Sequence, residues 1–436
     1  MKILKFGGTS VGSAERMRAL VKLIGGGGPK IVVLSAMSGT TNALAEIAAA
    51  AYAGDNKKAE ALINALERKY EAVAGELYAG EDALSKAKGL IRSHFSLLRS
   101  LTAGAFTLKE ERAVLAQGEL LSTAMFHYHL EEKNIASVLL PALDFMRIDA
   151  NGEPDMWYIE TNAVRALAGR PENDLFITQG YICRNAAGEI DNLKRGGSDY
   201  TATILGAAVG AEEIQIWTDI DGMHNNDPRV VENTRPLAEL SFDEAAELAY
   251  FGAKILHPTC ILPAREKNIP VRLLNTMKPE AKGTLITGRS TGESIKAVAA
   301  KDGITAIKIR SARMLLAYGF LRAVFEVFER YKTPIDMITT SEVAVSLTID
   351  DRKNLEAIVT ELKAFCSVEV DDDLSIICVV GNLTAEKEGY ALKIFESLKN
   401  VPIRMISYGG SENNVSVLVK TALKKRALLA LNEGLF

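Results

Sequence analysis

The chain has 436 residues, of which 48% are hydrophobic and 24% are charged, and its formal net charge is -4. This length predicts two or three domains, and the composition is that of an ordinary globular protein. A net charge so close to zero argues against a nucleic-acid-binding surface, and the lack of an apolar run of roughly 18 residues argues against a membrane helix.

Neither a secretory leader nor a disulfide framework is expected. Lys2 and Lys5 lie near the N-terminus, but no apolar run follows them. His127 and His129 would point to different sides of a helix, so they are not predicted to bind a metal. The cysteines are widely spaced, without a C-x-x-C pair, and are interpreted as reduced thiols of a cytoplasmic protein: Cys183, Cys260, Cys366 and Cys378.

The first third of the chain combines short strands with long helices. Residues 2–6 and 30–36 are short apolar runs that predict buried strands. Residues 13–24 between them predict a helix, with Ser13 as its N-cap. Residues 42–134 are rich in alanine, leucine, glutamate and lysine and are predicted to be mostly helical.

Strand and helix signals then alternate as far as residue 275. Helices are expected at residues 199–210 and 242–251, and strands at residues 136–142, 175–183, 214–219 and 270–275. This alternation predicts an α/β domain whose mainly parallel sheet has helices on both faces. Ligands of such sheets bind beyond the carboxyl ends of the strands, so the loops after residues 6, 36, 183 and 219 are the candidate binding loops.

The last third of the chain contains an internal repeat. Residues 334–339 match residues 402–407, and the Ser-Glu pair at residues 341–342 matches the pair at residues 411–412. The first copy has the order β-α-β-β-α-β, whereas the second ends in a helix without a closing strand. A missing strand would leave an unpaired sheet edge, so the copies are expected to pair or interleave, within one chain or between chains.

Four loop stretches carry charged residues that suit phosphoryl transfer. Lys5 precedes a pair of glycines, and residues 194–199 combine basic, glycine and acidic residues before a helix. Residues 217–229 begin at the end of a strand and carry acidic and turn residues, and Lys254 lies at the end of a helix. Each stretch also has a structural explanation as a glycine turn, a helix cap, an Asx turn or a lysine at a helix end. Spacing alone does not show that they converge, and neither a Walker A loop nor G-x-G-x-x-G is present.

Taken in order, these stretches resemble the aspartokinases within the amino acid kinase family. The matching motifs span residues 5–258 and are Lys5-Phe6-Gly7-Gly8-Thr9-Ser10-Val11, Ser35-Ala36 with Gly39, Thr41 and Asn42, Gln117-Gly118-Glu119, Arg195-Gly196-Gly197-Ser198-Asp199, Trp217-Thr218-Asp219, Asp227-Pro228-Arg229-Val230, and Phe251-Gly252-Ala253-Lys254 with Leu256-His257-Pro258. The repeat in the last third resembles paired ACT domains.

The resemblance implies a fold and a domain organisation. Residues 1–290 would form an amino-acid-kinase catalytic domain, a three-layer α/β/α sandwich with a mainly parallel central sheet. Two ferredoxin-like ACT domains with the order βαββαβ would follow, at residues 297–372 and 373–436, with interleaving of the two left open.

The resemblance also implies a reaction. An aspartokinase transfers the γ-phosphoryl group of ATP to the β-carboxylate of L-aspartate and forms 4-phospho-L-aspartate, the first step towards lysine, threonine and methionine. A carboxylate with a pKa near ~4 is already ionised at neutral pH, so no general base is needed. Lysines and Mg²⁺ must offset the repulsion between the anionic acceptor and the triphosphate, with the metal held mainly by ATP.

The motifs imply roles for individual residues. Catalysis would rest on Lys5, Asp199 and Lys254. The nucleotide would contact Lys5, Phe6, Gly7, Gly8, Thr218, Asp219, His224, Arg229, Lys254 and Ile255. Aspartate would contact Ser35, Thr41, Glu119, Arg195, Gly196, Gly197 and Ser198, with Arg195 on its α-carboxylate and Glu119 on its ammonium group. His224 stands where relatives often have a tyrosine facing the nucleotide.

The C-terminal part resembles the lysine-inhibited, single-activity branch of the family. Its effector pocket would comprise Met314, Ala317, Phe320, Leu321, Pro334, Ile335, Asp336, Ser341 and Glu342. Ala317 replaces a serine that lysine-sensitive relatives tend to have, so threonine remains the competing effector. The carboxylates of Asp336 and Glu342 suit a cationic amino acid, and a homodimer or homotetramer formed through the ACT domains is expected.

Two other functions compete with this one. The first is another amino acid kinase, which would phosphorylate acetylglutamate, glutamate or a nucleotide. The second is a non-catalytic amino-acid sensor that keeps the fold, although intact Lys5, Asp199 and Lys254 argue against it.

Overall fold

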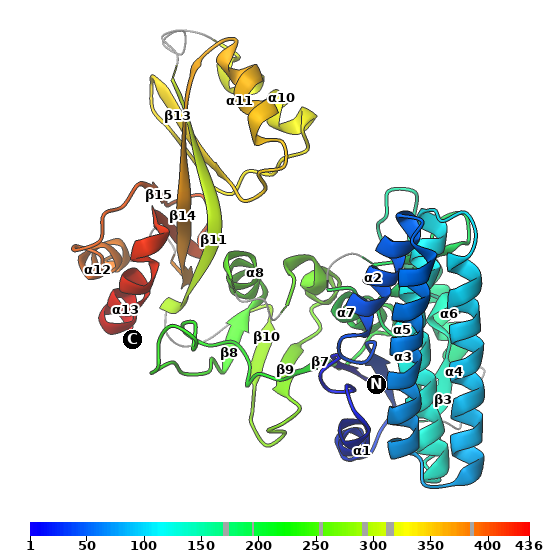
Figure 1. Cartoon of the computed structure of the whole chain (residues 1–436). Coiled ribbons are helices and arrows are strands. Elements are labelled where there is room, and N and C mark those ends of the chain that lie inside the picture. Colours follow the sequence, from blue (N-terminus) through cyan, green and yellow to red (C-terminus); the bar gives the residue numbers. More distant parts are fainter. Residues whose placement is uncertain (169–173, 194–195, 253–255, 290–294, 311–317, 384–387) are drawn as a thin grey trace. The chain divides into compact units, whose positions relative to one another are not determined.

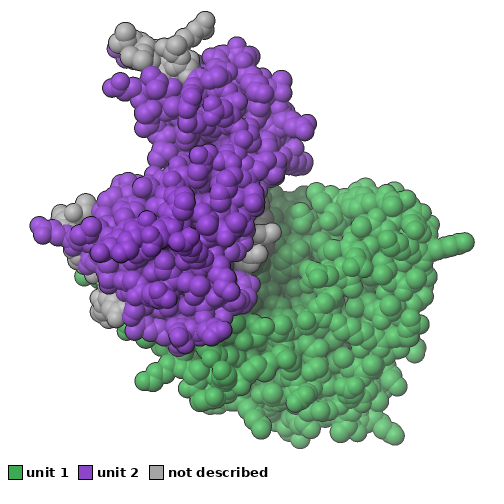
Figure 2. Space-filling view, turned by 60° about the vertical axis from the view of Figure 1, so that its left-hand side comes forward, with its two compact units in different colours: residues 1–223, 238–242, 255–290 green, residues 224–237, 243–254, 291–436 purple. Residues whose placement is uncertain are grey.

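The computed structural model describes residues 1–168, 174–193, 196–252, 256–289, 295–310, 318–383 and 388–436. The chain forms two compact units, which Figure 2 shows in different colours. The first unit comprises residues 1–223, 238–242 and 255–290, and the second comprises residues 224–237, 243–254 and 291–436.

An eight-stranded sheet forms the centre of the first unit, in the strand order β3-β4-β2-β1-β7-β9-β10-β8. Neighbouring strands are parallel except for the pair β9 and β10. The strands are β1 (Lys2–Phe6), β2 (Lys30–Leu34), β3 (Val138–Leu140), β4 (Leu175–Gln179), β7 (Glu213–Thr218), β8 (Glu239–Ser241), β9 (Val271–Asn275) and β10 (Thr284–Thr287), and a separate hairpin pairs β5 (Ile182–Arg184) with β6 (Ile190–Asn192).

Helices cover both faces of this sheet, which confirms the predicted three-layer α/β/α fold (Figure 1). Side chains alternate along β1, so Leu4 and Phe6 join the core that α1 to α5 build on one face. On the other face α7 contacts β1, and Gly206 of α7 lies close to Ile3. The helices are α1 (Ala14–Leu23), α2 (Thr40–Tyr52), α3 (Asn56–Leu77), α4 (Glu81–Thr102), α5 (Leu108–Glu132), α6 (Met156–Ala168), α7 (Gly197–Val209) and α9 (Leu262–Glu266).

One predicted strand is interrupted. Residues 175–183 were expected to form a single strand, but β4 ends at Gln179 and β5 begins at Ile182. The break lies at Gly180 and at Tyr181, which has a positive φ of 68°. A Cβ atom on Gly180 would lie 2.5 Å from Cβ of Ser198, so the close approach of α7 requires a glycine here.

The second unit is built on a six-stranded antiparallel sheet with the order β12-β13-β11-β14-β16-β15. Its strands are β11 (Ile295–Arg310), β12 (Ile338–Thr340), β13 (Ala344–Ile349), β14 (Ser367–Gly381), β15 (Met405–Ser407) and β16 (Asn414–Lys420). Its helices are α10 (Phe320–Arg330), α11 (Leu355–Lys363), α12 (Tyr390–Ser397) and α13 (Lys424–Leu435), together with residues 243–251 of α8 (Phe242–Phe251).

The long strands β11 and β14 serve both repeats of this sheet (Figure 1). Residues 305–310 of β11 pair with β13 in the first repeat, where Ile307 and Ile309 pack with α10 and α11. Residues 295–301 pair with the second half of β14 and close the second repeat, where Ile295 and Val298 pack with α12 and α13. Since β11 and β14 each belong to both repeats, the two repeats are not separate stretches of the chain. The predicted division into one ACT domain at residues 297–372 and another at residues 373–436 stays a prediction.

Within the described part of the chain, no helix has both the length and the apolar character that a bilayer-spanning helix needs.

Candidate active site

Four adjacent strands bring the predicted loops of the first unit to one edge of its sheet. Phe6 lies level with Leu34 on one side and with Trp217 on the other, and Leu34 lies level with Gln179. The carboxyl ends of β4, β2, β1 and β7 therefore lie side by side. The segments that follow them contain Gly7, Ser35, Gly180 and Asp219, so this sheet edge is where the topology places a ligand.

Lys5 and Asp199 form the charged centre of this edge. The Nζ atom of Lys5 lies 2.6 Å from Oδ1 of Asp199, and the two side chains are only 11% and 13% exposed. Lys5 lies on the face of β1 towards α7, and Asp199 lies in the first turn of α7. The structure thus joins two predicted catalytic residues that are far apart in the sequence.

The glycines after β1 allow the backbone to turn tightly at this point. A Cβ atom on Gly8 would lie 2.8 Å from the carbonyl oxygen of Ala36. The amide of Gly7 donates to the carbonyl oxygen of Trp217 at 3.3 Å, and the rings of Phe6 and Trp217 stack with their centroids 5.7 Å apart. These contacts fix the loop against the neighbouring strands and hold Lys5 in position.

The start of α7 is packed closely against the loop after β4. A Cβ atom on Gly197 would lie 2.6 Å from the ring of Tyr181, and one on Gly196 would lie 2.8 Å from Sγ of Cys260. Ser198 is the neighbour that excludes a side chain at Gly180. Gly196, Gly197 and Ser198 therefore lie where they were predicted, at a helix N-terminus whose dipole favours an anion.

Glu119 is a buried carboxylate beside the loop after β2. It lies on α5, is 3% exposed, and accepts a hydrogen bond from the amide of Ala36 at 3.1 Å. Burial raises the pKa of Glu119 to about 8, although the bond from Ala36 acts in the opposite direction. Its second oxygen, Oε2, is buried and has no hydrogen-bond partner among the described residues. A ligand ammonium group would supply the missing partner.

The other two predicted substrate residues in the described ranges lie near the same loop. The carbonyl oxygen of Ser35 accepts a hydrogen bond from Ser122 at 2.8 Å, so its backbone is tied to α5. Thr41 is exposed in the first turn of α2. Gly118 completes the contact between α5 and this loop, because a Cβ atom there would lie 2.7 Å from Cβ of Ala36.

Tyr181 is a residue of this edge that the sequence motifs did not single out. Its left-handed backbone is unusual for a bulky residue, and its amide donates to Oγ1 of Thr201 at 2.9 Å. Burial, followed by the charge of Glu119, raises the pKa of its phenol. A tyrosine after a glycine is an ordinary feature of a strand end, so only the fold reveals its place between Glu119 and Gly197.

The predicted nucleotide residues divide between the two units. Thr218 and Asp219 end β7 in the first unit, where the hydroxyl of Thr218 lies 3.2 Å from Oδ1 of Asp219. His224 and Arg229 belong to the second unit. His224 contacts Oγ1 of Thr234 at 3.0 Å, and Arg229, whose side chain is 79% exposed, pairs with Asp227 at 2.8 Å. The nucleotide contacts of these four residues remain predictions.

Some predicted residues fall outside the described residues: Arg195, Lys254, Ile255, Met314 and Ala317. The ranges that the structure does describe contain no group of three or more histidine, cysteine, aspartate or glutamate residues arranged to hold a metal ion.

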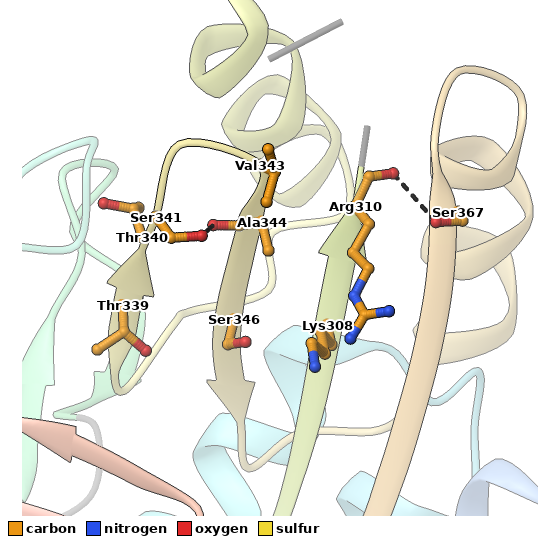
Figure 3. Close-up of a pocket in the computed structure, with 9 residues that line it drawn as sticks. All are labelled: Lys308, Arg310, Thr339, Thr340, Ser341, Val343, Ala344, Ser346 and Ser367. Carbon is orange, nitrogen blue, oxygen red and sulfur yellow. Dashed lines mark hydrogen bonds between the residues drawn. The ribbon is translucent and has the colours of Figure 1, made fainter. Parts of the chain in front are cut away.

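The described effector residues lie on the first repeat of the second unit. Phe320 and Leu321 begin α10, Pro334, Ile335 and Asp336 precede β12, and Ser341 and Glu342 follow it. Ser341 lines a cavity of about 640 Å³ on the face of the sheet away from α10 and α11 (Figure 3). Lys308, Arg310, Thr339 and Ser346 line the same cavity, so it is basic and rich in hydroxyl groups.

Comparison with known proteins decides the family. The model of the amino acid kinase family matches residues 1–275, and an ACT domain model matches residues 377–435. Lysine-sensitive aspartokinase 3 of Escherichia coli is 33% identical over 448 residues, which cover 100% of this chain and 99% of that protein. The chain belongs to the aspartokinases. It is thus an ATP-dependent kinase whose acceptor is a carboxyl group.

Further relatives and solved structures agree with this assignment. Chloroplastic aspartokinase 3 of Arabidopsis thaliana is 34% identical over 462 residues, covering 100% of this chain and 81% of that one. The structure of E. coli aspartokinase III with aspartate and ADP has a TM-score of 0.85 at 32% identity, with each chain covered to 100%. The structure of the same enzyme with lysine and aspartate has a TM-score of 0.81, again at 32% identity and 100% coverage of each chain.

Proposed function

We propose that this aspartokinase transfers the γ-phosphoryl group of ATP to the β-carboxylate of L-aspartate and that L-lysine inhibits it. The observation that carries the proposal is the unsatisfied, buried oxygen of Glu119 on the sheet edge that also holds Lys5 and Asp199. The edge thus offers a carboxylate for an ammonium group and a lysine for phosphoryl oxygens, as an amino acid acceptor and a nucleotide require. The solved complex of the E. coli enzyme with aspartate and ADP supports the same pair of ligands.

The chemical step needs positioning and charge rather than a base. An oxygen of the β-carboxylate attacks the γ-phosphorus, the bond from that phosphorus to the bridging oxygen of ADP breaks, and ADP leaves as the mixed anhydride 4-phospho-L-aspartate forms. The acceptor is already an anion, so no proton has to be removed from it. The main obstacle is repulsion between the acceptor and the triphosphate, which nearby cations reduce.

Lys5 supplies one such cation in a fixed place. Its ammonium group is held by Asp199 and is largely screened from water, so its charge acts on nearby phosphoryl oxygens more strongly than it would in bulk solvent. Asp199 orients the ammonium group and would help to place the Mg²⁺ ion that accompanies ATP. The phosphates would hold most of the Mg²⁺ coordination, the metal would offset part of their charge, and Lys254 would provide the second lysine.

Glu119 would select an amino acid acceptor. Its pKa of about 8 means that the free enzyme holds much of this carboxyl group protonated at neutral pH. An ammonium group that binds beside it favours the charged form, so aspartate binding would release a proton. Arg195 would bind the α-carboxylate, with Ser198 and Thr41 adding hydrogen bonds.

Lysine is the proposed effector because the chain aligns along its whole length with a lysine-sensitive enzyme. The solved complex of E. coli aspartokinase III with lysine and aspartate supports the same regulation. The two ACT repeats form one sheet within a chain, and a homodimer or homotetramer through these domains is part of the proposal.

An assay of ADP formation with different acceptors tests the proposed substrate. L-aspartate, acetylglutamate and glutamate would be compared at equal concentrations with ATP and Mg²⁺. We expect turnover with L-aspartate to be at least about 100-fold above turnover with acetylglutamate, whose acetylated nitrogen carries no positive charge for Glu119. We expect it to be at least about 10-fold above turnover with glutamate, whose side chain is longer by one methylene group. Turnover of acetylglutamate without turnover of aspartate would contradict the proposal.

A further inference from the structure

Two polar side chains of α8 bind different repeats of the six-stranded sheet. The carboxylate of Glu247 accepts hydrogen bonds from Oγ of Ser411 at 2.9 Å and from Nδ2 of Asn414 at 2.6 Å, both in the second repeat. Three residues later, on the same side of the helix, the hydroxyl of Tyr250 donates to Oδ1 of Asp336 at 2.7 Å, in the first repeat. The short helix α8 is therefore hydrogen-bonded to both repeats of the six-stranded sheet.

Asp336 also forms an ion pair with a lysine of the same unit. Nζ of Lys301, on β11, lies 2.8 Å from Asp336 and 2.8 Å from Asp350, and it sits 4.3 Å from the centre of the Tyr250 ring. Burial alone would lower the pKa of Lys301, but the bonds to Asp336 and Asp350 outweigh it and raise that pKa, so the ammonium group stays charged. The Asp336 side chain is only 2% exposed.

The backbone just after α8 is fixed to the same part of β11. Gly252 has a φ of 144°, and a Cβ atom there would lie 2.3 Å from the carbonyl oxygen of Ala300. Ala300 is the residue before Lys301. In the sequence, Lys254 follows Gly252 by two residues. Gly252, two residues before this predicted catalytic lysine in the sequence, therefore lies against β11 beside the Lys301–Asp336 pair.

An external cation that binds Asp336 would bring a second positive charge next to the ammonium group of Lys301, and the two charges would repel each other. One oxygen of Asp336 is shared by Lys301 and Tyr250, and the other, Oδ2, is buried without a hydrogen-bond partner among the described residues. We propose that Lys301 competes with the ammonium group of the effector for Asp336, and that Tyr250 transmits the exchange to α8. This inference rests on the proposed regulation by lysine. When the effector takes Asp336, Lys301 keeps Asp350, whereas Tyr250 loses its acceptor and α8 loses its attachment to the first repeat.

Substitutions of Lys301 test the competition, with lysine binding measured by calorimetry on the full-length protein. Lys301→Met removes the competing charge, so we expect lysine to bind at least about fivefold more tightly. Lys301→Arg offers a stronger bidentate partner to the carboxylates, so we expect lysine to bind at least about fivefold more weakly. If Lys301→Met does not fold, the lysine affinity of Lys301→Arg still tests the competition. Unchanged or tighter binding in Lys301→Arg would overturn the proposal.

Tyr250→Phe tests the transmission, because it removes the hydroxyl group and keeps the ring beside Lys301. We expect its dissociation constant for lysine to stay within about threefold of the parent value, while the maximal inhibition by lysine falls by at least half. Tyr52→Phe is the matched control, since Tyr52 is an exposed tyrosine of the first unit whose hydroxyl donates to Glu111 at 2.9 Å. Full inhibition of Tyr250→Phe, or binding weakened more than tenfold, would overturn the role of Tyr250.

The binding measurements separate this inference from the proposed function. Suppose that the parent protein binds lysine, that Lys301→Met binds it more tightly and Lys301→Arg more weakly, and that the parent fails to phosphorylate aspartate. This result would contradict the proposed reaction and support the inference. A parent that phosphorylates aspartate but binds no lysine would support the reaction and overturn the inference.

Discussion

The ammonium group of Lys5 and the carboxylate of Asp199 lie 2.6 Å apart, although 193 positions separate the two residues in the chain. Lys5 lies on the central strand β1, and Asp199 lies in the first turn of α7. This helix packs on the face of the sheet on which the Lys5 side chain lies. Their pairing places a screened positive charge where four strands end, and this arrangement is the physical basis of the proposed kinase site.

Lys5→Met should abolish most of the turnover. The substitution removes a cation that faces the triphosphate, and the loss of one preorganised charge lowers kcat about 10²- to 10³-fold. The KM for aspartate should change much less, because Lys5 is not proposed to touch the amino acid. Steady-state kinetics with Lys2→Met as control checks this, since Lys2 is an exposed residue of the same strand. A Lys5→Met enzyme with parental kcat would refute the charge-neutralising role.

Glu119→Gln should raise the KM for aspartate at least about tenfold, because the amide cannot balance an ammonium charge. In the parent enzyme, aspartate should bind more tightly as the pH rises from 7 towards 9, since the Glu119 carboxyl group, with its pKa of about 8, becomes charged over this range. The variant should lose that part of the pH dependence. Identical pH profiles of KM in the two enzymes would contradict the assignment of Glu119 to the substrate ammonium.

The same substitution makes a prediction for stability. The pKa of Glu119 is raised in the folded state, so its contribution to stability is complete below its unfolded pKa of about 4.5 and is lost as the pH rises through about 8. Glu119→Gln does not titrate. Its melting temperature relative to the parent should therefore be higher at pH 8 than at pH 5, as thermal unfolding at both pH values would show. A difference that is the same at both pH values would argue against a raised pKa.

Gly180→Ala should damage both the fold and the activity. The added Cβ atom would lie 2.5 Å from that of Ser198, so the start of α7, which carries Asp199, must shift. Such overpacking costs about 1–3 kcal/mol of the free energy of unfolding. Gly75→Ala, on α3 with nothing within 4 Å of the added atom, should be neutral or stabilising by up to about 1 kcal/mol. Denaturant unfolding of both variants provides the comparison, and equal stabilities would contradict the close approach at Gly180.

Local patterns in the sequence predicted much of the first unit. Ser13 was expected to cap the first helix, and its hydroxyl accepts a hydrogen bond from the amide of Arg16 at 3.3 Å. Helix 242–251 was expected with the bounds that α8 has. These features depend on neighbours within one or two helical turns, which the sequence displays directly.

Features that depend on distant contacts could not be predicted in this way. The break at Gly180 arises from Ser198. The repeats were expected to pair or interleave, but the strand that they share, β11, is identified only by its pairing with β13 and β14. Asp336 was expected to serve an effector, and its partner Lys301 lies 35 positions away in the sequence, on β11. The position of Tyr181 could not be predicted either, because its contact with Gly197 follows from the packing of α7.

The most direct test of the account is to trap the acyl phosphate with hydroxylamine, which converts it to a hydroxamate and distinguishes phosphorylated aspartate from simple ATP hydrolysis. The parent protein, supplied with ATP, Mg²⁺ and L-aspartate, should form aspartyl hydroxamate in proportion to ADP, and Lys5→Met should form it about 100-fold more slowly. ADP release by the parent without any hydroxamate, or equal hydroxamate formation by the two proteins, would contradict a site in which Lys5 assists phosphoryl transfer to the aspartate carboxylate.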